Sequence, residues 1–216
     1  SVVKKFFVIQ GPTHTGKSLV FDTIMSSVIG KENMGQEPLS YLTGRNAGST
    51  LIGKLLNWVD DENAKINGNK LDKLRSISGG ASIQVELKYK DPIIAKVPAT
   101  LIFGMNHIPD MLDASGAMDN RLHVIPFHVD FKKTPHKEQL ATRRAVRAML
   151  KDPLQISGII NDIIDTLREL VGNGFYLTKS VLSSKLKEEQ KNINQLELGW
   201  LNDDWENVVR PTIKDA

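Results

Sequence analysis

The sequence predicts an α/β fold in which a central, mainly parallel sheet is flanked by helices and followed by a small C-terminal helical subdomain. Two observations predict it. Residues 1–130 alternate between apolar, strand-like runs and segments with helical spacing, whereas residues 136–210 have helical spacing almost throughout. The change falls in the polar stretch FKKTPHK, around Pro135. We therefore expect a core over residues 1–131 and a helical subdomain over residues 132–216.

The bulk composition is that of an ordinary folded protein. The 216 residues are 40% hydrophobic and 25% charged, and the absence of cysteine excludes a disulfide framework or a thiolate zinc site. A net charge of +3 permits nucleic-acid binding without requiring it. The lack of cysteine also fits a reducing cytoplasm, where we expect the protein. No stretch reaches the roughly 18 apolar residues of a membrane helix, so we expect no membrane contact. Because the chain opens on Ser1 close to a core strand, we also expect it to be a piece of a larger protein.

A phosphate-binding loop follows the first predicted strand. Residues 4–10, KKFFVIQ, have the β-branched and aromatic content of a buried parallel strand, and GPTHTGKS then fits G-x-x-x-x-G-K-[ST]. Apolar residues recur at helical spacing after Ser18 until Gly30, the expected stop. Glycines let backbone N–H groups turn toward phosphate oxygens, and the helix N-terminus adds its positive dipole end. The residues expected to bind ATP are Gly11, Pro12, Thr13, His14, Thr15, Gly16, Lys17 and Ser18.

Within this loop, two side chains have expected roles. Lys17 would reach the β- and γ-phosphates, and the Ser18 hydroxyl would bind Mg²⁺. His14 sits inside the loop and would line the nucleotide, but the sequence assigns it no chemistry.

Three consecutive acids follow the second predicted strand. The apolar run in LIGKLLNWVDDE, residues 51–62, ends at Asp60, Asp61 and Glu62. Ligands of open α/β sheets bind at the carboxyl ends of the strands, where acids can hold Mg²⁺ and polarise water. We assign Asp60 and Asp61 to the metal, with Asp61 also near the attacking water and Glu62 as its substitute. Three adjacent acids leave open which one activates water.

The other elements are predicted from the same patterns. Residues 69–78 form a short helix, and residues 81–92 alternate between apolar and polar side chains, as one arm of a hairpin would. Residues 97–106 and 121–127 form two more buried strands. In the tail, residues 156–171 carry apolar side chains at i, i+3, i+4 and i+7, which predicts an amphipathic helix. We interpret its apolar stripe as packing against the rest of the chain rather than as a partner-binding site.

Two further polar residues are candidates for a role in hydrolysis. Asn106 ends the third buried strand, where it would orient the attacking water and sense the γ-phosphate, although asparagine before a turn is also ordinary turn chemistry. The order of loop, acids and asparagine favours the functional interpretation. Arg121 opens the last core strand and is either an arginine finger that reaches a neighbour's γ-phosphate or a surface ion-pair partner.

Taken together and in order, GPTHTGKS, WVDDE, KLRSISGGASIQVELKYKDP, ATLIFGMNHIP and DNRLHVIPF resemble the superfamily 3 helicases. The resemblance is strongest to the phage and plasmid primase–helicase group, whose ATPase is an AAA+ module, and it spans about residues 6–131. It implies a P-loop AAA+ core in an ATP- and Mg²⁺-dependent motor that encircles DNA as a ring. In the full-length protein that ring is expected to be a homo-hexamer. The resemblance implies that Lys17 and Ser18 belong to the first motif, Asp60 and Asp61 to the second, Asn106 to the sensor and Arg121 to the arginine-finger region.

The resemblance also places Lys88 and Lys90 on the hairpin that such helicases point into their central channel. It places Lys73 and Arg75 in an additional motif close to a neighbour's nucleotide. Lysines at a hairpin tip in a ring would bind the phosphates of single-stranded or forked DNA regardless of sequence, and the contact would be salt-sensitive. The alternative is a solvated lysine face on an edge strand, where lysines commonly block aggregation.

These features leave two functions open. The first is the ATP-driven replicative helicase motor of a phage, plasmid or mobile element, in a bacterial cytoplasm, acting with a primase domain or partner. The second is a nucleotide-gated module that assembles on origin DNA or loads another helicase without processive unwinding. A small-molecule kinase is disfavoured because neither a lid nor an acceptor pocket is recognisable. The basic residues Arg143, Arg144, Arg147 and Lys151 are interpreted as a solvated helix face rather than a DNA contact.

Overall fold

The structure is a computed structural model that describes residues 3–42, 47–60, 66–67, 70–86, 89, 91–108, 111–112, 120–178 and 180–204. In this part of the chain, a five-stranded parallel sheet has the order β2-β3-β7-β1-β9. Its strands are β1 (Phe6–Gln10), β2 (Met34–Gly35), β3 (Leu56–Val59), β7 (Thr100–Met105) and β9 (Leu122–Pro126). The predicted α/β fold with a mainly parallel central sheet flanked by helices is confirmed.

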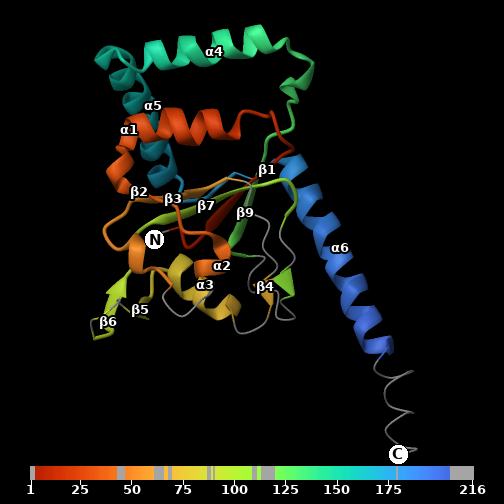
Figure 1. Cartoon of the computed structure of the whole chain (residues 1–216). Coiled ribbons are helices and arrows are strands. Elements are labelled where there is room, and N and C mark those ends of the chain that lie inside the picture. Colours follow the sequence, from red (N-terminus) through yellow and green to blue (C-terminus); the bar gives the residue numbers. More distant parts are fainter. Residues whose placement is uncertain are drawn as a thin grey trace, which may run out of the picture.

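Helices cover both faces of this sheet (Figure 1). One face carries the helix that follows β1, made of a π-helical segment η1 (Leu19–Met25) and α1 (Ser26–Ile29), with α4 (His136–Met149) beyond it. The other face carries α2 (Leu39–Leu42), α3 (Lys70–Ser78) and the hairpin of β5 (Ser82–Val85) and β6 (Ile93–Lys96). Helix α5 (Pro153–Gly172) returns from the end of α4 to contact α1, and α6 (Val181–Asp204) runs beside β9. The remaining elements are η2 (Lys31–Asn33), η3 (Ser49–Leu51), β4 (Ile66–Asn67), β8 (Met111–Leu112) and η4 (Phe131–Lys133).

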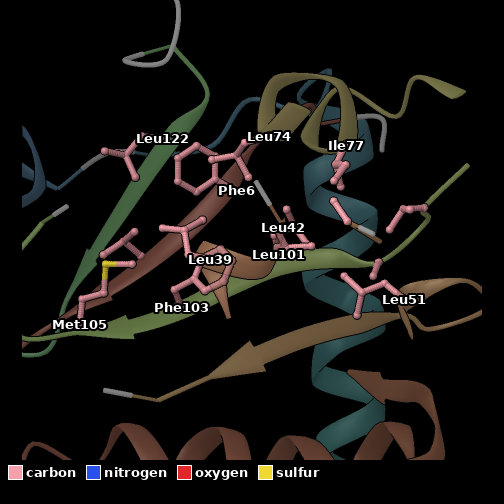
Figure 2. Close-up of a cluster of buried hydrophobic side chains, with 14 of the residues drawn as sticks. Phe6, Leu39, Leu42, Leu51, Leu74, Ile77, Leu101, Phe103, Met105 and Leu122 are labelled. Atoms are coloured by element: carbon pink, nitrogen blue, oxygen red, sulfur yellow. The ribbon is translucent and has the colours of Figure 1, made fainter. Parts of the chain in front are cut away.

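The two faces of β1 are both buried, as its apolar sequence predicts. Phe6 and Val8 point into the larger apolar cluster between the sheet and helices α2 and α3 (Figure 2), whereas Ile9 points to the α1 side with Phe21 and Trp58. Successive side chains of a strand face opposite sides, so a strand buried on both faces reads as a continuous apolar run. Each fully buried Phe, Leu or Ile in these clusters contributes about 1.5–3 kcal/mol. The two clusters thus bury β1 on both faces of the sheet, directly before the phosphate loop.

Several predicted elements differ in extent from what the sequence patterns indicated. The strand expected over residues 51–62 begins only at Leu56, because Gly53 adopts a positive φ of 79° and turns the chain before it. The helix after the phosphate loop ends at Gly30, as predicted, with φ 83°. The hairpin is present, with Ile83 and Val85 buried and Gln84 exposed between them.

The apolar stripe of α5 is more exposed than the predicted packing implies. Ile160, Ile163 and Ile164 are 36%, 42% and 39% exposed, and Leu167 and Val171 slightly more than half. The expectation that this stripe packs against the rest of the chain is therefore wrong for most of it. Helix α5 begins at a cap in which the Asp152 carboxylate accepts from Leu154 N, and it packs against α1.

Two side chains of α6 bind the outer edge of β9. The Ser183 hydroxyl donates to the Val124 carbonyl at 2.6 Å in a buried position, and Lys187 Nζ donates to the Leu122 carbonyl at 2.7 Å. Residues four apart on a helix lie on one face, and alternate carbonyls of a strand point the same way, so the two spacings match. Helix α6 thus satisfies edge carbonyls of the sheet. None of the helices in the described part of the chain is long and apolar enough to cross a lipid bilayer.

Candidate functional site

The loop GPTHTGKS leaves the sheet between two anchored neighbours. Gly11 N donates to the Met105 carbonyl at 3.0 Å, and Phe127 N donates to the Gln10 carbonyl at 2.6 Å, so the chain is held at the ends of β7 and β9. A Cβ on Gly11 would lie 2.1 Å from the Phe127 carbonyl oxygen. No other residue fits there without moving backbone, which explains glycine at the first position of the motif.

The interior of the loop places the lysine beneath it. Lys17 is only 5% exposed, and its Nζ donates to the carbonyls of Gly11 at 2.6 Å and Pro12 at 3.0 Å. The Thr15 hydroxyl also donates to the Pro12 carbonyl, at 3.0 Å. His14 turns the chain with a φ of 67°, a left-handed conformation that is costly for residues other than glycine. The loop is therefore a tightly wrapped cradle with a buried ammonium group in it.

The serine of the loop motif, Ser18, contacts Asp60, the first of the three predicted acids. Ser18 Oγ donates a hydrogen bond to Asp60 Oδ2, which joins the helix after β1 to the end of β3. Hydroxyl and carboxylate oxygens are ligands that Mg²⁺ accepts, so this donor pair fits the metal. Asp60 also lies against Gly104 of β7, where an added Cβ would come within 2.6 Å of Asp60 Oδ1. Asp61 and Glu62 lie outside the described residues.

A second acid approaches the same corner from the helix. Asp22 Oδ1 accepts a hydrogen bond from the Trp58 indole at 2.7 Å, and the Trp58 ring stacks on Phe21 at a centroid distance of 4.2 Å. Partial burial raises the pKa of the Asp22 carboxyl above its ordinary value, the Trp58 hydrogen bond opposes that rise, and the negative charge of Asp60 adds to it. The negative charge of Asp60 at the end of β3 thus acts on Asp22 of the helix after the loop.

A cavity of about 390 Å³ opens above the loop. One side is formed by the loop, the start of the helix and Asp60, and the other side by the η4 turn and α4. Its lining residues are Thr13, His14, Thr15, Gly16, Lys17, Ser18, Leu19, Asp60, Phe131, Thr134, Gln139, Thr142 and Arg143. Six of the eight loop residues predicted to bind nucleotide thus face one cavity, together with the first predicted acid.

The predicted asparagine lies at the same edge of the sheet. Asn106 directly follows β7, which pairs with both β1 and β3, and its carbonyl accepts from Gln10 Nε2 at 2.9 Å. It is exposed and is not among the residues that line the cavity in the described part of the chain. The strand order β3-β7-β1 therefore brings Asp60, Asn106 and the loop to one edge, with Asn106 at the margin.

Arg121 lies at the amino-terminal ends of the parallel strands, whereas the phosphate loop lies at their carboxyl ends. It directly precedes β9, so it sits at the amino end of a parallel strand, and its Nη1 donates to the Arg75 carbonyl at 3.1 Å. A Cβ on Gly79 would come within 2.7 Å of this Nη1. Within one chain, Arg121 does not meet the phosphate loop. It is instead grouped with the end of α3, near the other residues that the resemblance places close to a neighbouring subunit.

The predicted DNA-contacting lysines, Lys88 and Lys90, lie outside the described residues. Near them, Tyr89 is 92% exposed, and Ile94 on β6 is 81% exposed. Tyr89 and Ile94 thus present large side chains to solvent in this region of the chain.

Pattern analysis missed the second side of the cavity. Gln139, Thr142 and Arg143 come from a helix whose sequence reads as solvated, and Phe131 and Thr134 come from the polar segment taken as a boundary. The i, i+3, i+4 spacing of the three helical residues was visible, but polar residues at that spacing ordinarily face solvent. Only the return path of the chain over the loop identifies them.

A comparison with protein-family models places these residues in a known group. The model described as "Family of unknown function (DUF5906)" matches residues 9–121, slightly more than half of the 216-residue chain. The chain belongs to the DUF5906 family. The matched region begins in β1 and ends at Arg121, so it holds the loop, Asp60 and Asn106, but not α4.

Solved structures of similar fold include the NrS-1 C-terminal region. One apo structure matches with a TM-score of 0.57 and 14% sequence identity, and the match covers 99% of this chain and 51% of the NrS-1 chain. A second apo structure matches with a TM-score of 0.52 and 15% sequence identity, and that match covers 69% of this chain and 36% of the NrS-1 chain. This DUF5906 chain thus spans about half or less of the NrS-1 chains that it matches. A structure of JCV Helicase with a bound acetamide compound gives a TM-score of 0.46 at 14% identity, over 90% of this chain and 52% of that one.

Proposed function

We propose that this chain is an ATP-hydrolysing module and, more specifically, the motor domain of a superfamily 3 type DNA helicase. The observation that carries the proposal is the contact between Ser18 of the phosphate loop and Asp60 at the end of β3, at one edge of the sheet and beside a cavity. A phosphate loop joined to a carboxylate at the end of a nearby strand of the same sheet, here separated from β1 by β7, is the arrangement that P-loop NTPases use to hold Mg²⁺ and the phosphates. The fold shared with the NrS-1 C-terminal region supports the architecture.

The residues of this chain divide the work. Backbone N–H groups of the loop and the N-terminal end of the following helix would bind phosphate oxygens. Lys17 would exchange its two loop carbonyls for the β- and γ-phosphates, while Ser18 and Asp60 would hold Mg²⁺. Mg²⁺ bound there would neutralise charge on the phosphate oxygens. Asn106 would orient the attacking water from the margin of the site, and Asp61, with Glu62 as its substitute, would polarise that water.

Catalysis would need a second subunit. Arg121 lies at the sheet edge opposite the phosphate loop, so it can serve a nucleotide only in a neighbouring chain. The exposed apolar side chains of α5 support the proposed homo-oligomer, since contiguous exposed apolar surface commonly marks an interface. In such a ring, hexameric in the full-length protein, Lys88 and Lys90 would bind single-stranded or forked DNA through its phosphates.

The testing experiment is the ATPase rate per subunit, measured against protein concentration with and without single-stranded DNA. Lys17→Ala should abolish activity at every concentration. Arg121→Ala should lose the concentration-dependent part, because that part reports a site shared between subunits. Arg144→Ala is the matched control, since Arg144 is an exposed arginine of α4 that does not line the cavity.

The results separate the motor from the alternative. A rate that rises with concentration and with DNA, and falls in Arg121→Ala, supports the motor. Tight Mg²⁺–ATP binding and ATP-dependent DNA binding, with a slow rate indifferent to DNA, would favour the nucleotide-gated assembly module. Activity that persists in Lys17→Ala would refute the site itself.

A further inference from the structure

Two side-chain hydrogen bonds join the helix after the phosphate loop to the end of β3. In the first, Ser18 Oγ donates to Asp60 Oδ2. In the second, Trp58 Nε1 donates to Asp22 Oδ1 at 2.7 Å. Ser18 and Asp22 are four residues apart at the start of one helix, so their side chains project from the same face. Trp58 and Asp60 are two residues apart at the end of one strand, so they also share a face. The helix and the strand are therefore joined at two successive positions.

The Trp58 side of the second bond is fixed by packing. The Trp58 side chain is 2% exposed, and its ring stacks on Phe21 at a centroid distance of 4.2 Å. An added Cβ on Gly104 of β7 would lie 2.7 Å from Trp58 Cη2, so the ring also lies close to the backbone of the adjacent strand. The indole has a single N–H group, which can only donate. Asp22 thus accepts from a donor that has little freedom to move.

The two bonds differ in their relation to the metal. Ser18 and Asp60 are the side chains that would hold Mg²⁺, so their direct hydrogen bond would be given up when the metal is bound. The bond between Trp58 and Asp22 uses neither of these oxygens, so it can persist with and without the metal. Asp22 is also not among the residues that line the cavity in the described part of the chain. It can therefore act on the site through β3, but not as a nucleotide contact.

We propose that Asp22 is a positioning residue of the nucleotide site, whose hydrogen bond to Trp58 keeps Asp60 beside Ser18 for Mg²⁺ binding. This inference rests on the proposed function and adds a residue that lies outside the phosphate-loop motif and the three acids. Without the bond, the strand end would lose the connection to the helix that does not depend on the metal. Partners that orient metal ligands in this way commonly change metal affinity by about 10- to 100-fold when they are removed.

The experiment measures the affinity of the 216-residue chain for ATP by titration calorimetry, once with Mg²⁺ and once with EDTA. The ratio of the two dissociation constants gives the Mg²⁺ effect. Asp22→Ala removes the acceptor and should reduce this effect by roughly 10-fold, while the affinity in EDTA changes by less than about twofold. Asp22→Asn removes the same charge but keeps an oxygen that can accept from the indole, so it should recover most of the loss. Asp162→Ala is the control for loss of an exposed aspartate, here on α5, and should leave the Mg²⁺ effect within about twofold.

A second variant tests the donor of the same hydrogen bond. Trp58→Phe removes the indole N–H and keeps an aromatic ring to stack on Phe21, so it should reduce the Mg²⁺ effect as Asp22→Ala does. The double variant should lose no more than either single variant, because both changes remove one bond. Additive losses would refute the bond as the cause. Urea unfolding of each variant measures the structural cost separately, since a purely structural role would weaken ATP binding equally in Mg²⁺ and in EDTA.

The outcomes distinguish this inference from the function on which it rests. If Asp22→Ala keeps the wild-type Mg²⁺ effect while Lys17→Ala loses ATP binding, the inference fails and the nucleotide site stands. The same conclusion follows if the wild-type chain binds ATP equally in Mg²⁺ and in EDTA. Equal losses in Asp22→Ala and Asp22→Asn would assign the effect to charge and overturn the role of the hydrogen bond. If the wild-type chain binds no nucleotide, both the inference and the proposed function fail.

Discussion

Replacing Gly104 by alanine tests whether the packing between β7 and β3 holds the proposed metal ligand. The added Cβ would lie 2.6 Å from Asp60 Oδ1 and 2.7 Å from Cη2 of Trp58, whose side chain is 2% exposed. Both distances are below those that real Cβ atoms show, so the Asp60 carboxylate or the Trp58 ring must move. Trp58 is stacked on Phe21 and has little room, which makes Asp60 the more mobile of the two.

The cost of Gly104→Ala has two opposing parts. Overpacking a well-filled site costs about 1–3 kcal/mol, while replacing glycine in a strand recovers about 0.5–1 kcal/mol. We expect a net loss of about 0–2.5 kcal/mol in the free energy of unfolding. Displacing Asp60 from Ser18 should also weaken Mg²⁺-dependent nucleotide binding by about 10-fold or more, the factor typical of disturbed ligand positioning.

The assay pairs urea unfolding with nucleotide titrations in Mg²⁺ and in EDTA. Gly158→Ala is the matched control, because Gly158 lies inside α5 with open space around it, and it should stabilise the chain by about 1 kcal/mol. A Gly104→Ala variant with wild-type stability and an unchanged Mg²⁺ effect would refute the packing argument. A loss of affinity that is equal in Mg²⁺ and in EDTA would show that Asp60 does not act through the metal.

Three further predictions concern single side chains. His14→Gly should stabilise the chain by about 1 kcal/mol in thermal unfolding, because the residue has a left-handed φ; an unchanged or lower melting temperature would contradict the assigned backbone strain. For Asp22, whose pKa is raised in the folded state, stability is fully present below the unfolded value of 3.8 and is lost as pH rises through the folded pKa. Asp22→Asn should therefore gain stability relative to wild type as the pH rises above 3.8 in EDTA, and equal pH profiles in urea unfolding would disprove the shift. Ser183→Ala leaves the buried Val124 carbonyl without this donor and should cost about 1–3 kcal/mol, whereas the exposed Ser184→Ala should change stability by less than about 0.5 kcal/mol in the same assay.

The sheet and the phosphate loop could be predicted because short sequence patterns indicate each of their elements. An apolar strand, a glycine-rich turn and a helix with a glycine stop lie within residues 4–30, and each element is visible without knowledge of the rest. The placement of Asp60 followed from a general property of parallel sheets rather than from its own surroundings. Its contact with Ser18 needed only the strand order.

The side of the cavity that α4 forms could not be predicted in this way, because its position depends on how the chain returns over the loop. Arg143 has the sequence surroundings of a solvated helix face, and nothing local distinguishes it from Arg144. The exposure of Ile163 and Leu167 escaped prediction for the same reason: periodicity identifies an apolar face but not its partner. For α5, the pattern identified the stripe correctly, and the expectation that the stripe packs within the chain was wrong for most of it.

The pairing of β1 has a consequence for the order of folding. Phe7 pairs with Ile102 and Phe6 with Leu122, so the strand that carries the phosphate loop is flanked only by segments roughly a hundred residues further along the chain. Contacts of such high sequence separation form late, because the entropy cost of closing a long loop comes before the contacts stabilise the chain. A nascent chain that has been synthesised only as far as α3 contains the phosphate loop but lacks β7 and β9, the two strands that pair with β1. Nucleotide binding would therefore report that the core has been completed, and ATP added during refolding should act on the last step rather than the first.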